Sequence, residues 1–252
     1  MNKINTIRNS PGRFGNHFVR GFACNFLAKK LNLKFDYGQY YPMIKELGIN
    51  FFEDGKNTYA YSNTLYIDDK YFDDIFYKIM SSKKPPELNI IMFDSYYQTS
   101  KFANLLQKYF QIEEYNNPVI KNNIYKYRYN NNNDLFVHVR LDDVKIHNAG
   151  FEYYDKILSS IKFDKGYIAS DEITHEICKK LIKKYNLKVI NLPEIPTIMF
   201  GSTCRYVVLT SGTFSFVIGI LSFFSKVFYL KQFNTWCPAS LYEINDWTEV
   251  TL

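Results

Sequence analysis

The chain has 252 residues, of which 46% are hydrophobic and 22% are charged, and its formal net charge is +6. This length suits one large domain or two small ones, and the composition is that of a globular protein and not of a disordered one. The Lys residues at 179, 180, 183 and 184 fall on one expected helix. We interpret them as its solvated face and expect no nucleic-acid binding, because no recognised nucleic-acid module is present.

Cysteine spacing and hydropathy exclude several other classes of protein. The four cysteines are widely separated and form no Cys-x-x-Cys pair, so reduced and mostly buried thiols are expected. Residues 206–230 are apolar enough to resemble a membrane span, but small polar residues from Ser211 to Thr213 interrupt them. A strand, a turn, a helix and a second strand explain that stretch equally well. Residues 1–10 lack the apolar core of a signal peptide, so we expect a cytoplasmic protein without a transmembrane segment.

The first half of the chain predicts a strand, a glycine-containing loop and a helix, followed by a stretch with no clear pattern. The expected strands lie near Ile4–Arg8 and at Asn89–Phe93, and the expected helices at Asn16–Leu31 and Thr99–Phe110. Residues 36–87 are rich in Tyr, Asp and Asn and are interpreted as short helices and loops. Residues 116–133 contain Pro and many Asn residues, including a run from 130 to 133, and predict a linker.

The second half alternates strands and helices. The expected strands are Leu135–Arg140, Gly166–Ala169, Lys188–Ile190, Tyr206–Thr210 and Val227–Leu230. The expected helices are Phe151–Ile161, Glu172–Tyr185 with Ser170 or Asp171 as its cap, Thr197–Cys204 and Thr213–Phe224. This alternation predicts an α/β fold with parallel sheets. We expect two Rossmann-like parallel-sheet domains facing a cleft, an N-terminal domain at 1–128 and a C-terminal domain at 134–252.

The end of the strand at 135–140 carries the strongest chemical signal. Alternation along a strand places His138 and Arg140 on one face. In open α/β sheets ligands bind at the carboxyl ends of the strands, where the Arg140 guanidinium is able to grip a diphosphate with two charge-assisted hydrogen bonds. Asp143 is a candidate to orient that arginine or to take a proton. A strand end with a salt bridge is an equally good interpretation on spacing alone.

A second signal lies in the segment from Tyr206 to Ser215, where a strand runs into a turn of small residues and then into a helix. The free N–H groups and the dipole at the start of that helix favour phosphate, and the hydroxyls of Ser211, Thr213 and Ser215 add donors. Ser and Thr are also favoured as ordinary helix caps, so the segment is ambiguous when it is taken alone.

Two weaker signals are a glycine loop and an acidic strand end. Gly12-Arg13-Phe14-Gly15-Asn16-His17 precedes a helix but matches neither the dinucleotide fingerprint nor the P-loop. Ser170-Asp171-Glu172 is either a contact to a ribose or base, or simple capping. No Asp-x-Asp triplet and no metal-ligand spacing of histidines occurs, and Asp68, Asp69, Asp73 and Asp74 are expected to be solvated. We therefore expect no metal.

Taken in order, these segments resemble one family, the inverting α1,2-fucosyltransferases, and more distantly the α1,6- and protein O-fucosyltransferases. The loop at 12–17 resembles the family's Gly-Gly-Leu-Gly-Asn-Gln, and residues 96–102 resemble its Tyr-x-Gln-Ser segment. His138, Arg140 and Asp143 match its His-x-Arg-x-x-Asp. Residues 168–172 and 211–215 match its Ser-Asp-Asp and Ser-x-Ser/Thr-Phe-Ser stretches.

The resemblance implies a metal-independent GT-B-like transferase that moves fucose from GDP-fucose to a glycan acceptor with inversion. It implies no other cofactor. Arg140 and Asp143 are the catalytic residues it implies, and Arg13 and His17 lie on the acceptor side. The implied donor-binding residues are Gly15, Asn16, His138, Arg140, Ser170, Asp171, Ser211, Thr213, Phe214 and Ser215.

The chain also departs from the family pattern. Leu141 replaces a second basic residue, Asp142 replaces a glycine, and His17 replaces the usual Gln. These changes bear on the sugar and the acceptor more than on the fold. Two alternatives therefore stay open at this point: a GT-B transferase that uses another nucleotide deoxysugar, and a non-catalytic protein that binds glycans or nucleotides.

Overall fold

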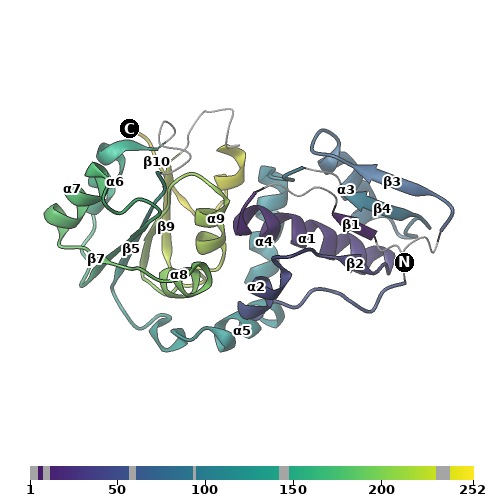
Figure 1. Cartoon of the computed structure of the whole chain (residues 1–252), viewed down its shortest axis with the longest axis horizontal. Helices are drawn as coiled ribbons and strands as arrows, with labels where there is room; N and C mark the ends of the chain where they lie inside the picture. The colour runs from purple at the N-terminus through teal and green to yellow at the C-terminus, as the bar shows by residue number, and fades with distance from the viewer. Residues whose placement is uncertain (1–4, 8–11, 57–60, 93–94, 142–147, 231–238) are drawn as a thin grey trace. The chain divides into compact units, whose positions relative to one another are not determined.

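The computed structural model describes residues 5–7, 12–56, 61–92, 95–141, 148–230 and 239–252 (Figure 1). The chain divides into two compact units, residues 1–102 and residues 103–252. The division falls inside the helix α4, Ser100–Gln111.

The first unit is built on a parallel four-stranded sheet with the order β2-β1-β4-β3. Its strands are β1 (Asn5–Ile7), β2 (Phe35–Asp36), β3 (Thr64–Ile67) and β4 (Asn89–Met92). Its helices are α1 (Phe14–Leu31), α2 (Tyr41–Glu46) and α3 (Phe72–Ser81). The predicted first helix, the predicted strand near residue 90 and the start of α4 are confirmed.

Residues 36–87 hold more regular structure than the sequence predicted. They contain the strand β3, and they contain α3, whose buried residues Phe72, Phe76 and Ile79 lie on one face of the helix. The rings of Phe72 and Phe76 each contact Phe102 at centroid distances of 5.3 Å. The aromatic residues that obscured the pattern in this segment are therefore part of the core of the first unit.

The second unit holds a parallel six-stranded sheet with the order β10-β9-β8-β5-β6-β7. Its strands are β5 (Leu135–Val139), β6 (Gly166–Ser170), β7 (Lys188–Val189), β8 (Tyr206–Val208), β9 (Lys226–Leu230) and β10 (Thr248–Val250). Its helices after α4 are α5 (Glu113–Asn122), α6 (Gly150–Leu158), α7 (Glu176–Tyr185), α8 (Glu194–Gly201) and α9 (Thr213–Ile220). Short 3-10 turns are η1 (Lys126–Arg128) and η3 (Ala239–Tyr242). The predicted α/β class with two parallel sheets is confirmed, and a cleft between the units stays a prediction.

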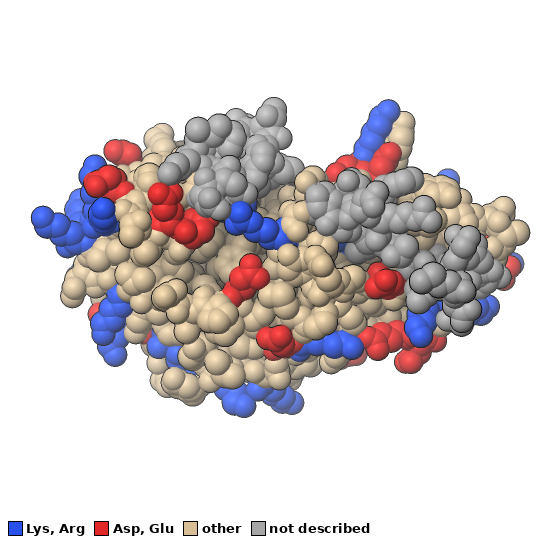
Figure 2. All heavy atoms as spheres, in the orientation of Figure 1, with Lys and Arg blue, Asp and Glu red and all other residues tan. Residues whose placement is uncertain are grey.

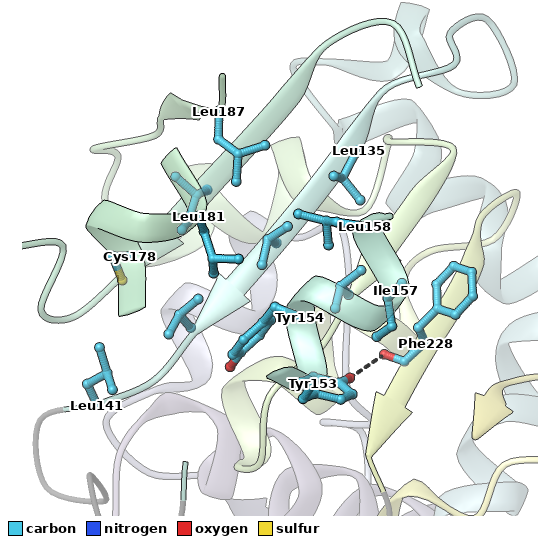
Figure 3. Close-up of a cluster of buried hydrophobic side chains, with 14 residues drawn as sticks. Leu135, Leu141, Tyr153, Tyr154, Ile157, Leu158, Cys178, Leu181, Leu187 and Phe228 are labelled. Carbon is cyan, nitrogen blue, oxygen red and sulfur yellow. Dashed lines mark hydrogen bonds between the residues drawn. The ribbon is translucent and has the colours of Figure 1, made fainter. Parts of the chain in front are cut away.

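One face of β5 packs into the core of the second unit (Figure 3). Leu135, Val137 and Val139 alternate along the strand and are fully buried in a cluster with side chains of α6 and α7. Tyr153 of α6 belongs to this cluster, and its hydroxyl donates to the main-chain oxygen of Leu209, the residue after β8, at 2.8 Å. His138 lies on the opposite face of β5, as the alternation predicted.

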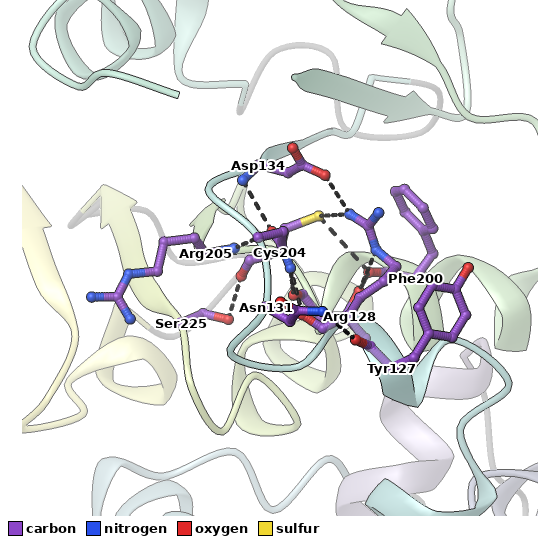
Figure 4. A network of polar contacts seen from close by, with 10 residues as sticks. Tyr127, Arg128, Asn131, Asp134, Phe200, Cys204, Arg205 and Ser225 are labelled. Carbon is purple, nitrogen blue, oxygen red and sulfur yellow. Dashed lines mark hydrogen bonds and ion pairs between the residues drawn. The ribbon is translucent and has the colours of Figure 1, made fainter. Parts of the chain in front are cut away.

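The segment predicted as a linker belongs to the second unit. Residues 113–122 form α5, and Asn123 donates its side-chain amide to the carbonyl oxygen of Met199 at 2.8 Å. Arg128 forms an ion pair with Asp134 at 2.8 Å and donates to Thr203 Oγ1 at 3.1 Å (Figure 4). These contacts attach residues 123–134 to the second unit.

The described surface and thiols agree with two simpler predictions. Lys179, Lys180, Lys183 and Lys184 on α7 are all exposed, and Figure 2 shows lysine side chains gathered over this helix. Cys24, Cys178 and Cys204 are buried free thiols. Across the described part of the chain, no helix combines the length and the apolar character needed to span a membrane.

The Arg128–Asp134 pair gives a test of the second unit's stability. The two side chains are only 14% and 7% exposed, so Arg128→Met leaves a nearly buried carboxylate without its counter-ion. We expect a loss of about 3 kcal/mol in the free energy of unfolding, measured by urea denaturation. Arg205→Met is the matched control, because Arg205 is exposed. Equal losses in the two variants would contradict this role of the pair.

Candidate functional site: the carboxyl edge of the second sheet

Three adjacent parallel strands end at one edge of the second sheet, and each is followed by polar residues. β5 lies between β6 and β8, with Val139 opposite Ser170 and Val137 opposite Val208. Arg140 follows β5, Asp171 follows β6, and Thr210 and Ser211 follow β8. Because parallel strands present their carboxyl ends at the same edge, residues that are far apart in the sequence meet there.

The His138 side chain on β5 contacts the first turn of α9. Its Nδ1 lies 2.6 Å from Ser215 Oγ, and both side chains are buried. Burial, and secondly the positive charge of Arg140, lower the pKa of His138 to about 3. The imidazole is therefore neutral near pH 7, and Ser215 either donates to or accepts from its Nδ1 according to the tautomer.

The Arg140 side chain lies against the backbone of Gly212. A Cβ atom on residue 212 would clash with Arg140 Nη1 and displace the guanidinium. Gly212 has a φ of +111°, which strains any other residue, so the backbone favours glycine at the turn between β8 and α9. On the other side, Asn148 donates its amide to the Arg140 carbonyl oxygen at 2.8 Å and anchors the backbone that carries the guanidinium.

Gly212 is the N-cap residue of α9, so the guanidinium lies at the positive end of that helix. Among the described residues no side chain caps α9, and its first turn contains no acidic residue. The first N–H groups of a helix have no acceptor within the helix. Ser211 adds a buried hydroxyl oxygen that has no hydrogen-bond partner in the described part of the chain. Donors and positive charge thus converge where the sequence predicted a phosphate site.

Tyr242 holds this turn in place, and no sequence pattern indicated this role. The residue lies in η3, about thirty positions after the turn, and its hydroxyl is within hydrogen-bond distance of the carbonyl oxygens of Gly212 and Thr210, the latter at 3.1 Å. The Tyr242 hydroxyl therefore holds the Thr210–Ser211 and Gly212–Thr213 peptide groups. In a chain with 22 tyrosines, nothing in the local sequence distinguishes this one.

Asp171 lies at the same edge but has a different local role from the predicted helix cap. Its Oδ1 accepts the main-chain N–H of Leu141 at 2.8 Å, so it fixes the backbone directly after Arg140. Ser170 Oγ accepts from the N–H of Glu172 at 3.1 Å. The helix α7 begins only at Glu176, and His175 caps it through its ring nitrogen. The predicted cap was wrong because the residues after β6 form a turn before the helix starts.

Phe214 lies in the first turn of α9, and its ring centroid is 5.2 Å from that of His138. Four other predicted site residues belong to the first unit. Arg13, Gly15, Asn16 and His17 lie in the first unit, at the start of α1. Asn16 Oδ1 accepts from the side-chain amide of Gln98 at 2.9 Å, which joins two of the segments used in the family resemblance. His17 is buried, and its ring centroid lies 4.4 Å from that of Tyr40, with the two rings tilted by 35°. Asp143 lies outside the described residues.

In the ranges that the structure describes, no three His, Cys, Asp or Glu side chains come together as metal ligands would. The absence of a metal therefore stays a prediction. The described donors at the edge include a guanidinium, hydroxyls and main-chain N–H groups, which suit an anion, and the Asp171 carboxylate already accepts the Leu141 N–H.

No protein-family model matches the chain, and no curated protein matches it. The chain is similar to crystal structures of POFUT1 in complex with GDP, in the apo form and in complex with GDP-fucose, each at 14% identity. For the GDP complex the TM-score is 0.42, and the match covers 88% of this chain and 95% of that chain. For the apo form the TM-score is 0.43, with 85% and 93% covered. For the GDP-fucose complex it is 0.41, with 86% and 93% covered. Likeness at this level assigns neither a ligand nor an activity to the chain.

The buried pair of His138 and Ser215 predicts a particular pH dependence of stability. The pKa of His138 is about 3 in the folded state against 6.5 as its ordinary value, so below pH 6.5 the unfolded chain binds a proton that the folded chain does not. Stability therefore falls as the pH falls. Between pH 6.5 and about pH 5, the wild type should lose roughly 1.5 kcal/mol more than His138→Asn in urea denaturation.

The control for this experiment is His175→Asn, which removes a histidine outside the pair and retains a residue type that caps helices. If the wild type and His138→Asn lose stability in parallel over this pH interval, His138 is not held neutral by burial.

Proposed function

We propose that the chain is a glycosyltransferase that takes fucose from GDP-fucose and transfers it to a glycan acceptor with inversion. One observation carries the proposal: the Arg140 guanidinium packs on Gly212 at the uncapped start of α9. The guanidinium fork, the N–H groups at the start of α9 and the Ser211 hydroxyl, which has no hydrogen-bond partner in the described part of the chain, form a set of donors for an anion with several oxygens. A diphosphate fits this set better than a single carboxylate, because it presents oxygens to both the fork and the helix.

The chemistry follows from where charge develops. The acceptor hydroxyl oxygen forms a bond to the anomeric carbon of fucose, while the bond from that carbon to the β-phosphate oxygen breaks. The bonding electrons leave with the GDP, so negative charge grows on the phosphate oxygen. Arg140 and the start of α9 stabilise that charge, and such preorganised stabilisation is usually the largest single contribution to the rate. We assign to Asp143 the uptake of the hydroxyl proton.

The neutral state of His138 supports the same assignment. A second positive charge on His138 beside Arg140 would be destabilised by burial and repulsion, which is why its pKa is lowered to about 3. His138 instead fixes Ser215 through the 2.6 Å contact and so fixes the first turn of α9. In this proposal His138 positions the phosphate-binding turn, and Arg140 carries the charge.

The identity of the sugar donor, and the part of the chain that binds the acceptor, are inferred from the sequence resemblance. The segments at 12–17, 96–102, 138–143, 168–172 and 211–215 occur in the order found in the α1,2-fucosyltransferases. From this order we infer a guanosine nucleotide, with Gly15, Asn16, Ser170 and Asp171 contributing to its binding. We also infer an acceptor glycan near Arg13 and His17, an α1,2-linkage and no requirement for a metal.

A second candidate function is transfer of another deoxysugar from its nucleotide. The described donors around Arg140 and α9 recognise phosphate and not the base or the sugar, so they fit any nucleoside diphosphate sugar equally well. Calorimetry with GDP, UDP and dTDP separates the two candidates. Tightest binding of GDP supports the fucosyltransferase, and binding of UDP or dTDP alone contradicts it. A protein that binds GDP-fucose but releases no GDP in an acceptor screen would be a binding protein and not a transferase.

Substitution of Arg140 tests the diphosphate site. Arg140→Ala removes two charge-assisted hydrogen bonds, and we expect GDP affinity measured by calorimetry to fall by about 100-fold. Arg140→Lys keeps the charge but loses the fork, and we expect a fall of roughly tenfold. Arg205→Ala, at an exposed position of the same unit, should bind GDP as the wild type does. Transfer activity should fall with affinity and should persist in EDTA.

Wild-type GDP affinity in Arg140→Ala, with the fold preserved by circular dichroism, would eliminate the proposed site. Loss of transfer activity in EDTA would show that the metal-independent mechanism is wrong while leaving the diphosphate site intact.

A further inference from the structure

The second unit contains a cavity of about 260 Å³ at the opposite end of α9 from Arg140. It is lined by the last residues of α9, by α4 and by the turn that contains Asp246 and Trp247. The α9 helix has 8 residues, and at 1.5 Å per residue its two ends lie about 12 Å apart. The cavity is therefore a separate site and not an extension of the phosphate-binding turn.

Planar polar groups that bond to one another line one wall of this cavity, on its solvent-exposed side. Gln107 and Gln111 lie one turn apart on α4 and donate their side-chain amides to the same oxygen of Asp246, at 2.7 Å and 3.0 Å. Each amide keeps a carbonyl oxygen and a second N–H hydrogen, and the carboxylate keeps its other oxygen. The wall thus offers donors and acceptors in alternation.

Aromatic rings form another part of the lining. Phe110 and Phe223 both line the cavity, and their ring centroids lie 6.3 Å apart. Trp247 also lines it, and a Cβ atom on Gly219 would lie 2.5 Å from the edge of the indole. The indole is therefore packed directly on the backbone of α9 and has little freedom to move, so the cavity has a preformed apolar surface beside its polar wall.

The lining does not suit anions, and its one carboxylate is partly compensated. No Lys or Arg is among the described residues that line the cavity, so it lacks the charge that a phosphate group needs. Asp246 is the one acidic residue among them, and two amide N–H groups already point at one of its oxygens. A carboxylate beside aromatic rings also suits an ammonium group, so a cation is the competing ligand that the experiment must exclude.

We propose that this cavity binds one neutral sugar ring. A sugar ring carries hydroxyls that both donate and accept, which matches the amides and the carboxylate, and it has an apolar face that matches the aromatic surface. The cavity is smaller than the roughly 300 Å³ at which pockets for drug-sized ligands begin, so it suits a single ring. The choice of a sugar over other neutral ligands rests on the proposed function, because a transferase acting on a glycan meets a chain of such rings.

The test is saturation-transfer NMR with the methyl glycosides of glucose, galactose, mannose, fucose and N-acetylglucosamine, with choline as the cation probe. We expect at least one glycoside to bind the wild type. The double variant Gln107→Ala/Gln111→Ala should weaken that binding by about tenfold, because it removes both amides from the wall. Lys108→Ala, at an exposed position on the same helix, is the matched control and should bind normally. Asp246→Asn provides a second variant of nearly unchanged shape and should also weaken binding.

Two comparisons distinguish glycoside binding in this cavity from GDP binding at the proposed transferase site. Arg140→Ala should retain the glycoside while losing GDP, and the double glutamine variant should retain GDP while losing the glycoside. Three results would overturn the inference: no glycoside binds the wild type, glycoside binding is unchanged in the double glutamine variant, or choline binds in a manner that depends on Gln107 and Gln111 while the glycosides do not.

Discussion

The parallel pairing of β8, β5 and β6 is the constraint on which the candidate site depends. It places the residues after three strands at one edge of the sheet, although they come from positions 140, 171 and 211 of the sequence. The alternation of β5 then divides its side chains between two environments. Leu135, Val137 and Val139 enter the core under α6 and α7, and His138 faces the start of α9. The same strand therefore stabilises the unit and positions the site.

Electrostatics at this edge are arranged for an anion. The guanidinium of Arg140 occupies the space that a side chain on residue 212 would fill, and so lies directly against the backbone of the turn. Burial keeps His138 neutral, and Asp171 directs one oxygen to the Leu141 N–H group, where it fixes the backbone next to Arg140. Tyr242 and Asn148 hold the two backbone segments from which the donors project. In the proposed transfer these contacts would limit the reorganisation that accompanies the developing negative charge, which is how a preorganised site accelerates group transfer.

The sequence predicted the parts of this arrangement that depend on local pattern. The buried strands at β5 and β8 and the small-residue turn before α9 follow from hydrophobic runs and helix-start chemistry, and they were located correctly. Long-range contacts were not predictable. Asp69, expected only to be solvated, accepts the main-chain N–H of Tyr97 at 2.6 Å across 28 positions. Tyr242 reaches the turn across a similar separation, and the Asn-rich segment that predicted a linker is joined to the second unit by Arg128 and Asn123. Such contacts depend on the assembled fold, and no local pattern encodes them.

The most direct test of this account is a crystal structure of the protein soaked or co-crystallised with GDP. The account predicts that the diphosphate lies at the start of α9, with its oxygens within hydrogen-bond distance of the Arg140 guanidinium and of main-chain N–H groups in the first turn from Thr213. GDP bound elsewhere on the chain, with Arg140 free of contact to phosphate, would contradict it.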